Sequence, residues 1–180
     1  MTDITTLNIP ETIPVHTLKD MVAFPYMVVA LFLKEEEIAA FEESIAYNNL
    51  VALVKTRPEG GEGLDGLCTI GTLCKVNKLI RLSEGGAKAT VEGLCRISLE
   101  RITAEKPFLL AAVEPIREFT EKTMVSEALV SSLNALLKIA LSYGRPLPDD
   151  VMKMLDYIDN PARLADLVTL YINLPVDEQQ

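Results

Sequence analysis

Residues Ile70–Ile102, IGTLCKVNKLIRLSEGGAKATVEGLCRISLERI, form two alternating segments on either side of the turn sequence Ser83-Glu84-Gly85-Gly86. Apolar residues take the even positions of the first segment (Ile70, Cys74, Val76, Ile80, Leu82) and the odd positions of the second (Ala89, Val91, Cys95, Ile97, Leu99). A period of two is typical of a strand with one buried and one solvated face. The segments therefore predict a hairpin that places Ile80 opposite Ala89, Cys74 opposite Cys95 and Ile70 opposite Leu99.

The chain on either side of this hairpin supplies further expected elements. Three carboxylates, Glu35-Glu36-Glu37, open a predicted helix that ends at Asn48-Asn49, since carboxylates favour the positive end of a helix dipole. The segment MVVALFL is almost continuously apolar, which predicts a strand buried on both faces. The predicted strands outside the hairpin are Thr12–Leu18, Met27–Leu33, Leu50–Thr56 and Phe108–Ile116.

Beyond Arg117 the period changes to that of helices. Residues 126–143 carry a leucine-rich stripe, a short helix is expected from Asp149-Asp150, and Asn160-Pro161 predicts the cap and first turn of another helix. Strands followed by helices indicate an α+β chain, with a β-rich domain over residues 1–117 and a helical subdomain over residues 118–180.

Composition and charge narrow the class of protein. The 180 residues are 49% apolar, enough for a barrel with a small helical appendage. No apolar run approaches the roughly 20 residues of a membrane span, and the N-terminus lacks the features of a signal peptide, so a cytoplasmic location is expected. The net charge of −9 argues against nucleic acid and against an anionic membrane as partners.

The cysteines and the single histidine do not form a recognised metal site. Cys68, Cys74 and Cys95 contain no CxxC pair, and His16 is the only imidazole, so neither a metal nor another cofactor is expected. The predicted Cys74–Cys95 pair leaves two interpretations, a disulfide or two reduced thiols in the interior. The second is favoured in a cytosolic protein.

Four segments in order resemble the N-terminal domain of the Lon family of ATP-dependent proteases. They are IPVHTLKDMVAFPYMVVALFL, IGTLCKV, VEGLCRI and IDNPARLADLVTLYINLP. The resemblance implies a PUA-like six-stranded β-pseudobarrel with one helix, followed by a small C-terminal helical bundle. The chain departs from the family pattern at Tyr26, where the family has glycine, at Ala30, where it has proline, and at Lys34-Glu35, where it has Gly-Arg.

The resemblance also implies a function, namely the recognition of unfolded or degron-bearing proteins for a parent protease that is hexameric in the family. In that protease the ATPase domain, which uses ATP and Mg²⁺, and the serine–lysine protease domain lie outside this region. The chain contains no GxxxxGK[ST] motif. The ending VDEQQ, where family members continue into further helix, favours an excised domain. The alternative is a stand-alone Lon-domain protein that acts as an adaptor or assembly module.

Recognition of unfolded chains requires exposed apolar surface. In the predicted register Leu73, Leu79 and Leu94 fall on the polar outer face of the hairpin, and Tyr26 and Met27 belong to the FPYM turn. These five residues are the candidate substrate contacts. The other interpretation is that they are isolated surface residues or are covered by the C-terminal helices.

Two other function classes are weaker. Catalysis would need a nucleophile–base pair or opposed carboxylates, and His16 is expected to be an exposed or hydrogen-bonded strand residue, so the chain alone is expected not to be an enzyme. RNA binding is suggested only by the PUA-like architecture, and the acidic balance opposes it.

Overall fold

The computed structural model describes residues 8–61, 63–117, 123–142, 158, 160–171 and 174–180. The chain divides into two compact units, Met1–Arg117 together with Gln180, and Glu118–Gln179. This division falls at the boundary expected from the change of period. That each part is a domain able to fold alone stays a prediction.

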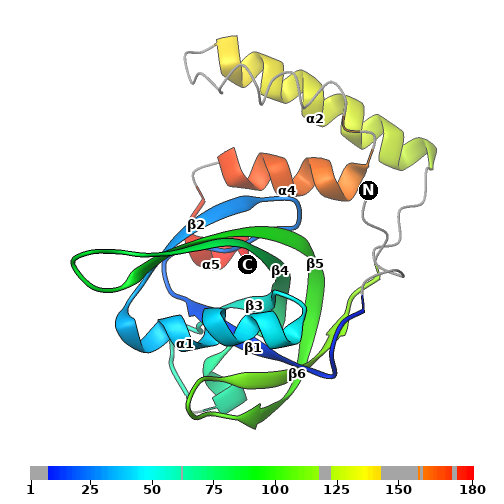
Figure 1. Ribbon diagram of the computed structural model, residues 1–180. Helices are drawn as coiled ribbons and strands as arrows, with labels where there is room; N and C mark the ends of the chain where they lie inside the picture. The colour runs from blue at the N-terminus through cyan, green and yellow to red at the C-terminus, as the bar shows by residue number, and fades with distance from the viewer. Residues whose placement is uncertain (1–7, 62, 118–122, 143–157, 159, 172–173) are drawn as a thin grey trace. The chain divides into compact units, whose positions relative to one another are not determined.

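The first unit is a six-stranded sheet that closes nearly into a ring (Figure 1). The order β2-β5-β4-β3-β1-β6 is completed by a second pairing between β6 and β5, which leaves β2 outside the ring as an extra strand on β5. Among the strands that the structure describes, only β1 and β3 pair in parallel. The strands are β1 (Thr12–Leu18), β2 (Val28–Leu33), β3 (Leu50–Lys55), β4 (Ile70–Arg81), β5 (Ala87–Ala104) and β6 (Leu110–Pro115). The α+β class and the six strands are confirmed.

The strand buried on both faces is β3, not the Met27–Leu33 segment. All six residues of β3 are buried, because β3 is a central strand of the ring, with β1 on one side and β4 on the other. Along β2 exposed and buried residues alternate, so the expectation of two buried faces is wrong. The apolar run could not reveal this, since β2 has a sheet neighbour on one side only among the described strands.

The hairpin exists, but its register differs from the prediction, by one residue over Ile70–Leu73 and Lys78–Arg81 and by two residues over Cys74–Val76. Leu82 belongs to the turn, where its N–H donates to the carbonyl of Gly86, so Arg81 pairs with Ala87. Leu79 rather than Ile80 then lies opposite Ala89, and Leu73 rather than Cys74 lies opposite Cys95. Two register shifts, one between Leu73 and Cys74 and one between Val76 and Lys78, are bulges that the alternation did not indicate.

Helix α1 (Glu35–Glu43) begins at the predicted carboxylates and continues as a 3₁₀ turn, η2 (Ser44–Tyr47). The Glu37 side chain accepts the N–H of Lys34 at 2.7 Å, closing the first turn. Arg81 donates to Glu35 at 2.8 Å and to Glu42 at 2.7 Å, which ties the end of β4 to the helix. Glu35 also accepts the N–H of Gly86, and this bond together with Arg81 lowers the pKa of the Glu35 carboxyl.

Two clusters of buried apolar side chains pack against the sheet. One lies under α1 and includes Phe41, Val91 and Cys74; the other includes Ile13, Leu73 and Cys95. Cys74 and Cys95 are buried and are not joined in a disulfide, as expected for thiols that fill the interior. They do not pair directly across the hairpin, because Cys74 lies opposite Gly93.

The second unit contains α2 (Met124–Ser142), α4 (Pro161–Tyr171) and α5 (Val176–Gln179). The predicted cap is confirmed, since the side-chain oxygen of Asn160 accepts the N–H groups of Ala162 and Arg163. Leu164 and Val168 form a small core with α2 residues Val130, Leu133 and Leu137. Leu129 and Leu136 also belong to the leucine-rich stripe predicted over residues 126–143, but both side chains are exposed.

The helix expected from Asp149-Asp150 lies outside the described residues. Among the helices that are described, none combines the length and the apolar content needed to cross a membrane.

Candidate functional site

The five predicted contact residues lie in different environments. Tyr26 is 42% exposed, whereas Met27 is half-buried against the core cluster under α1. Leu73 has no exposed surface, so its expected place on the outer face is wrong. Leu79 and Leu94 are half-buried and pack against the two core clusters. The one-residue difference in register explains Leu73, since pairing with the buried Cys95 turns its side chain inward.

Tyr26 occupies a special backbone position. Its φ of 66° lies in the left-handed region, which residues with a Cβ seldom adopt. The turn is fixed by two hydrogen bonds to β5, from the N–H of Tyr26 to the carbonyl of Gly93 and from the N–H of Gly93 to the carbonyl of Met27, both 2.8 Å. The glycine that the family pattern places here would adopt this φ without strain, so the chain holds an exposed aromatic ring at a conformational cost.

Beside this turn lies an apolar surface that sequence reasoning missed. The outward side chains of β2 are Val28, Ala30 and Phe32, which we call the outer β2 face. Val28 is 63% exposed and Phe32 is 73% exposed. Across β5, Lys88 lies opposite both Phe32 and Ile80, so the exposed Ile80 belongs to the same outer surface.

A signal for the outer β2 face was present but ambiguous. Met27–Leu33 contains no charged residue. The same sequence pattern is therefore compatible with a strand buried on both faces and with an edge strand that exposes one apolar face. The distinction depends on the position of β2 in the sheet, which is set by partners distant in sequence.

The charges next to the outer β2 face are mainly positive. The stretches of β5 and β4 that lie across from Val28–Phe32 carry Lys75, Lys78 and Lys88 and one carboxylate, Glu92. The ammonium of Lys88 lies 5.6 Å from the centre of the Phe32 ring, a cation–π distance. Glu92 accepts a hydrogen bond from Asn77 at 3.2 Å. A cationic, apolar surface therefore lies on a chain whose net charge is −9.

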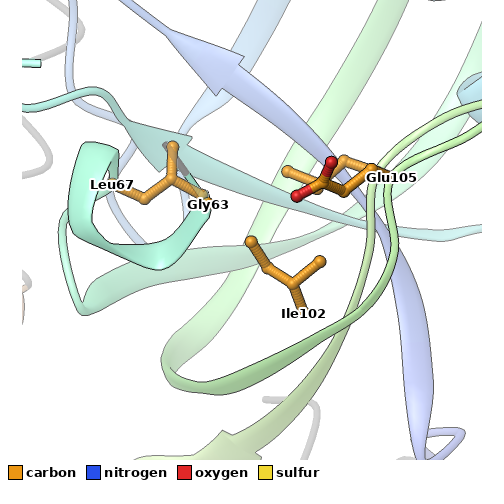
Figure 2. Close-up of a pocket in the computed structure, with 5 residues that line it drawn as sticks. Gly63, Leu67, Ile102 and Glu105 are labelled. Atoms are coloured by element: carbon orange, nitrogen blue, oxygen red, sulfur yellow. The ribbon is translucent and has the colours of Figure 1, made fainter. Parts of the chain in front are cut away.

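A separate pocket of about 430 Å³ lies near the end of β5. Its lining residues are Gly63, Leu67, Ile102, Glu105 and Leu109. Figure 2 shows the Glu105 carboxylate and the Leu67 side chain on opposite sides of the pocket, with the Ile102 side chain below and between them. One carboxylate among apolar groups provides neither a nucleophile–base pair nor a set of metal ligands.

His16 was expected to be an exposed or a hydrogen-bonded strand residue; it lies in β1, and its side chain is largely buried. Its ring makes an edge contact with Phe41, with 5.2 Å between ring centroids, and its Nδ1 lies 4.0 Å from a Glu37 oxygen. Burial lowers the pKa of His16, and Glu37 partly opposes this effect. A neutral ring inside the core at α1 is a packing group. The described residues also contain no group of three or more His, Cys, Asp or Glu side chains arranged to hold a metal ion.

Comparisons of the chain with a family model and with known proteins identify the same family. Residues 12–180 match the family model described as the ATP-dependent protease La (LON) substrate-binding domain. The chain is 60% identical to the Lon protease of Citrifermentans bemidjiense over 181 aligned positions, which cover 100% of the chain and 23% of that protease. It is 32% identical to Lon protease 2 of Bdellovibrio bacteriovorus over 97% of the chain and 22% of the relative.

A solved structure has the same fold. The N-terminal domain of the Mycobacterium avium complex Lon protease superposes with a TM-score of 0.72 and 21% identity, covering 93% of the chain and 87% of that domain. The chain thus spans less than a quarter of the length of the Lon proteases that it matches.

Proposed function

Because the chain belongs to the family of Lon substrate-binding domains, we propose that it binds unfolded or degron-bearing polypeptides for degradation by an ATP-dependent Lon protease. The observation that carries this proposal is the outer β2 face, with Val28 and Phe32 more than half exposed beside the exposed ring of Tyr26. Unfolded chains differ from folded ones in the apolar side chains that they display, and a contiguous apolar surface distinguishes the two.

The chain would act by binding alone. On this proposal, ATP and Mg²⁺ act in the ATPase part of a cytoplasmic, hexameric protease, and peptide bonds are cleaved in its serine–lysine part. The proposed role of these residues is to hold a polypeptide near the assembly, with no cofactor of their own. Of the residues named from sequence, Tyr26 and Met27 remain the proposed contacts, joined now by Val28 and Phe32. Leu79 and Leu94 expose less surface, and their contribution to binding stays a prediction.

The test is an NMR titration of the chain with a reduced, unfolded model protein and with the folded form of the same protein. We expect shifts at Tyr26, Val28 and Phe32 with the unfolded form only. Phe32→Ala should weaken binding by about 5-fold or more, since truncating an exposed aromatic contact removes about 1 kcal/mol of binding free energy or more.

Ile45→Ala is the matched control. Ile45 is 72% exposed, close to the 73% of Phe32, but lies in the 3₁₀ turn after α1. Equal losses from both substitutions would mean that any exposed apolar side chain contributes, and would contradict a defined site. Absence of binding to the unfolded protein would contradict the proposed function.

A further inference from the structure

We propose that the edge of β2 binds an extended apolar segment with acidic flanking residues by adding it to the sheet as a further strand. This inference rests on the proposed function and names both the mode of binding and the class of segment. It follows from three features of β2: its unpaired edge, the absence of edge protection, and the charges beside it.

The first feature is the free backbone of β2. Among the described strands β2 pairs with β5 alone, whereas every other strand has a partner on both sides. Met27 accepts from Gly93, and residues of an antiparallel pair alternate between facing the partner and facing away. The N–H and C=O groups of Val28, Ala30 and Phe32 therefore point to the open edge, while Val29, Leu31 and Leu33 bond to β5.

The second feature is the lack of protection along this edge. Natural sheets guard exposed edges with charges, proline or bulges, because an unguarded edge recruits other strands. Val28–Leu33 has none of these, and its pairing with β5 runs without a register shift. The first charge is Lys34, after the strand has ended. An edge of this kind is suited to β-augmentation, in which main-chain bonds give affinity for many sequences.

The third feature is charge complementarity. Lys75 and Lys78 lie on β4, two strands from β2 and therefore three strands from an added strand, which is about 14 Å at normal strand spacing. Lys88 lies on β5, next to Phe32. Carboxylates that flank the added segment would lie about 10 Å from the β5 position of Lys88, which is within about a Debye length, whereas Lys75 and Lys78 lie farther away and are more strongly screened. Apolar side chains of the added strand would meanwhile lie beside Val28 and Phe32, as cross-strand neighbours.

Amide hydrogen exchange of the whole chain tests strand addition directly. The probe is a blocked peptide, Glu-Thr-Val-Thr-Val-Thr-Glu, in which the valines and both glutamates share one face of the strand. We expect new protection at the N–H groups of Val28, Ala30 and Phe32, with little change at Val29, Leu31 and Leu33, which already bond to β5. Protection that appears without peptide and rises with protein concentration would show that a second copy occupies the edge, and would overturn the proposal.

Two N-methylated forms of the peptide provide a control that leaves the protein intact. One carries N-methyl groups on the valines and the other on the threonines, so each removes the donors along one side of the strand. Strand addition requires that one form loses binding by at least about 10-fold while the other retains it. Equal binding of both forms, with shifts still at Phe32, would overturn strand addition while leaving the proposed function intact. The same conclusion follows if an unfolded protein binds and the peptide does not.

A protein variant and a charge-reversed peptide complete the test. Ala30→Pro removes an N–H that points away from β5, so the ladder to β5 remains while the edge is blocked; Ala30→Ser is its control. Circular dichroism checks that both variants fold. Replacing both peptide glutamates with lysine should weaken binding several-fold at low salt, with the difference shrinking as salt rises. Unchanged affinity on charge reversal would overturn the acidic preference.

Discussion

Tyr26 shows how a single residue can combine strain with exposure. A left-handed backbone costs a residue with a Cβ about 1–2 kcal/mol relative to glycine. The φ of 66° is imposed by the paired hydrogen bonds with Gly93, not by the tyrosine itself. A strained position that persists with a large aromatic side chain is consistent with a ring kept for contact with a partner.

The strain can be measured with two substitutions that differ by one methyl group. Tyr26→Gly and Tyr26→Ala both remove the ring, so every interaction of the ring cancels in their comparison. We expect the glycine variant to be more stable than the alanine variant by about 1 kcal/mol in chemical denaturation, because only alanine keeps the left-handed penalty. Equal stabilities would mean that the turn relaxes out of the left-handed region. Both variants should bind unfolded protein more weakly than the parent chain.

At the scale of elements, β5 determines where the other strands lie. It pairs with β2, β4 and β6 along its 18 residues. Gly93 lies where the chain before β2 crosses it, and a Cβ there would collide with the backbone oxygen of Phe24. Backbone atoms cannot rotate aside as a side chain can, so the crossing requires glycine for space.

Gly93→Ala should therefore destabilise the chain by about 2 kcal/mol or more, as expected for overpacking against fixed atoms. Gly60→Ala is the matched control, because a Cβ at Gly60 meets nothing within 4 Å although its φ is +59°. The control should lose only about 1 kcal/mol, the cost of a left-handed alanine. Thermal or urea unfolding of both variants makes the comparison. A loss at Gly93 no larger than that at Gly60 would mean that β5 and Phe24 separate easily.

The sequence predicted what local pattern determines, and missed what distant partners determine. The bounds of β1 and the start of α1 were predicted as found, because alternation and a run of carboxylates are local signals. The burial of Leu73 was not, since it depends on one extra residue in the turn and on bulges in both strands. The exposure of Val28 and Phe32 was missed for a related reason: only the closure of β6 onto β5 leaves β2 outside the ring.

At the scale of the whole molecule, each described core cluster draws its residues from one unit. The two clusters of the sheet use residues between Ile9 and Val113, and the third uses residues of the helical unit. The ring is complete once β6 ends at Pro115.

We therefore expect a fragment of residues 1–117 to fold alone. Its amide NMR spectrum should superpose on that of the full chain for β1 to β6, and it should unfold in one cooperative transition. If the fragment bound a hydrophobic dye and gave collapsed, poorly dispersed signals, the helical part would be needed for the sheet to fold.

The position of β1 has a consequence for biosynthesis. β1 is the first strand of the sheet to leave the ribosome, yet one of its two neighbours, β6, is the last strand of the sheet to be made. The β4–β5 hairpin forms from neighbouring stretches of chain, and β2 pairs with it across a loop of moderate length. The pairing of β1 with β6 closes the longest loop of the sheet, so it can form only after β6 has been made. Translation thus sets the order of assembly, and a pause before Leu110 would leave the nascent chain with an unclosed ring.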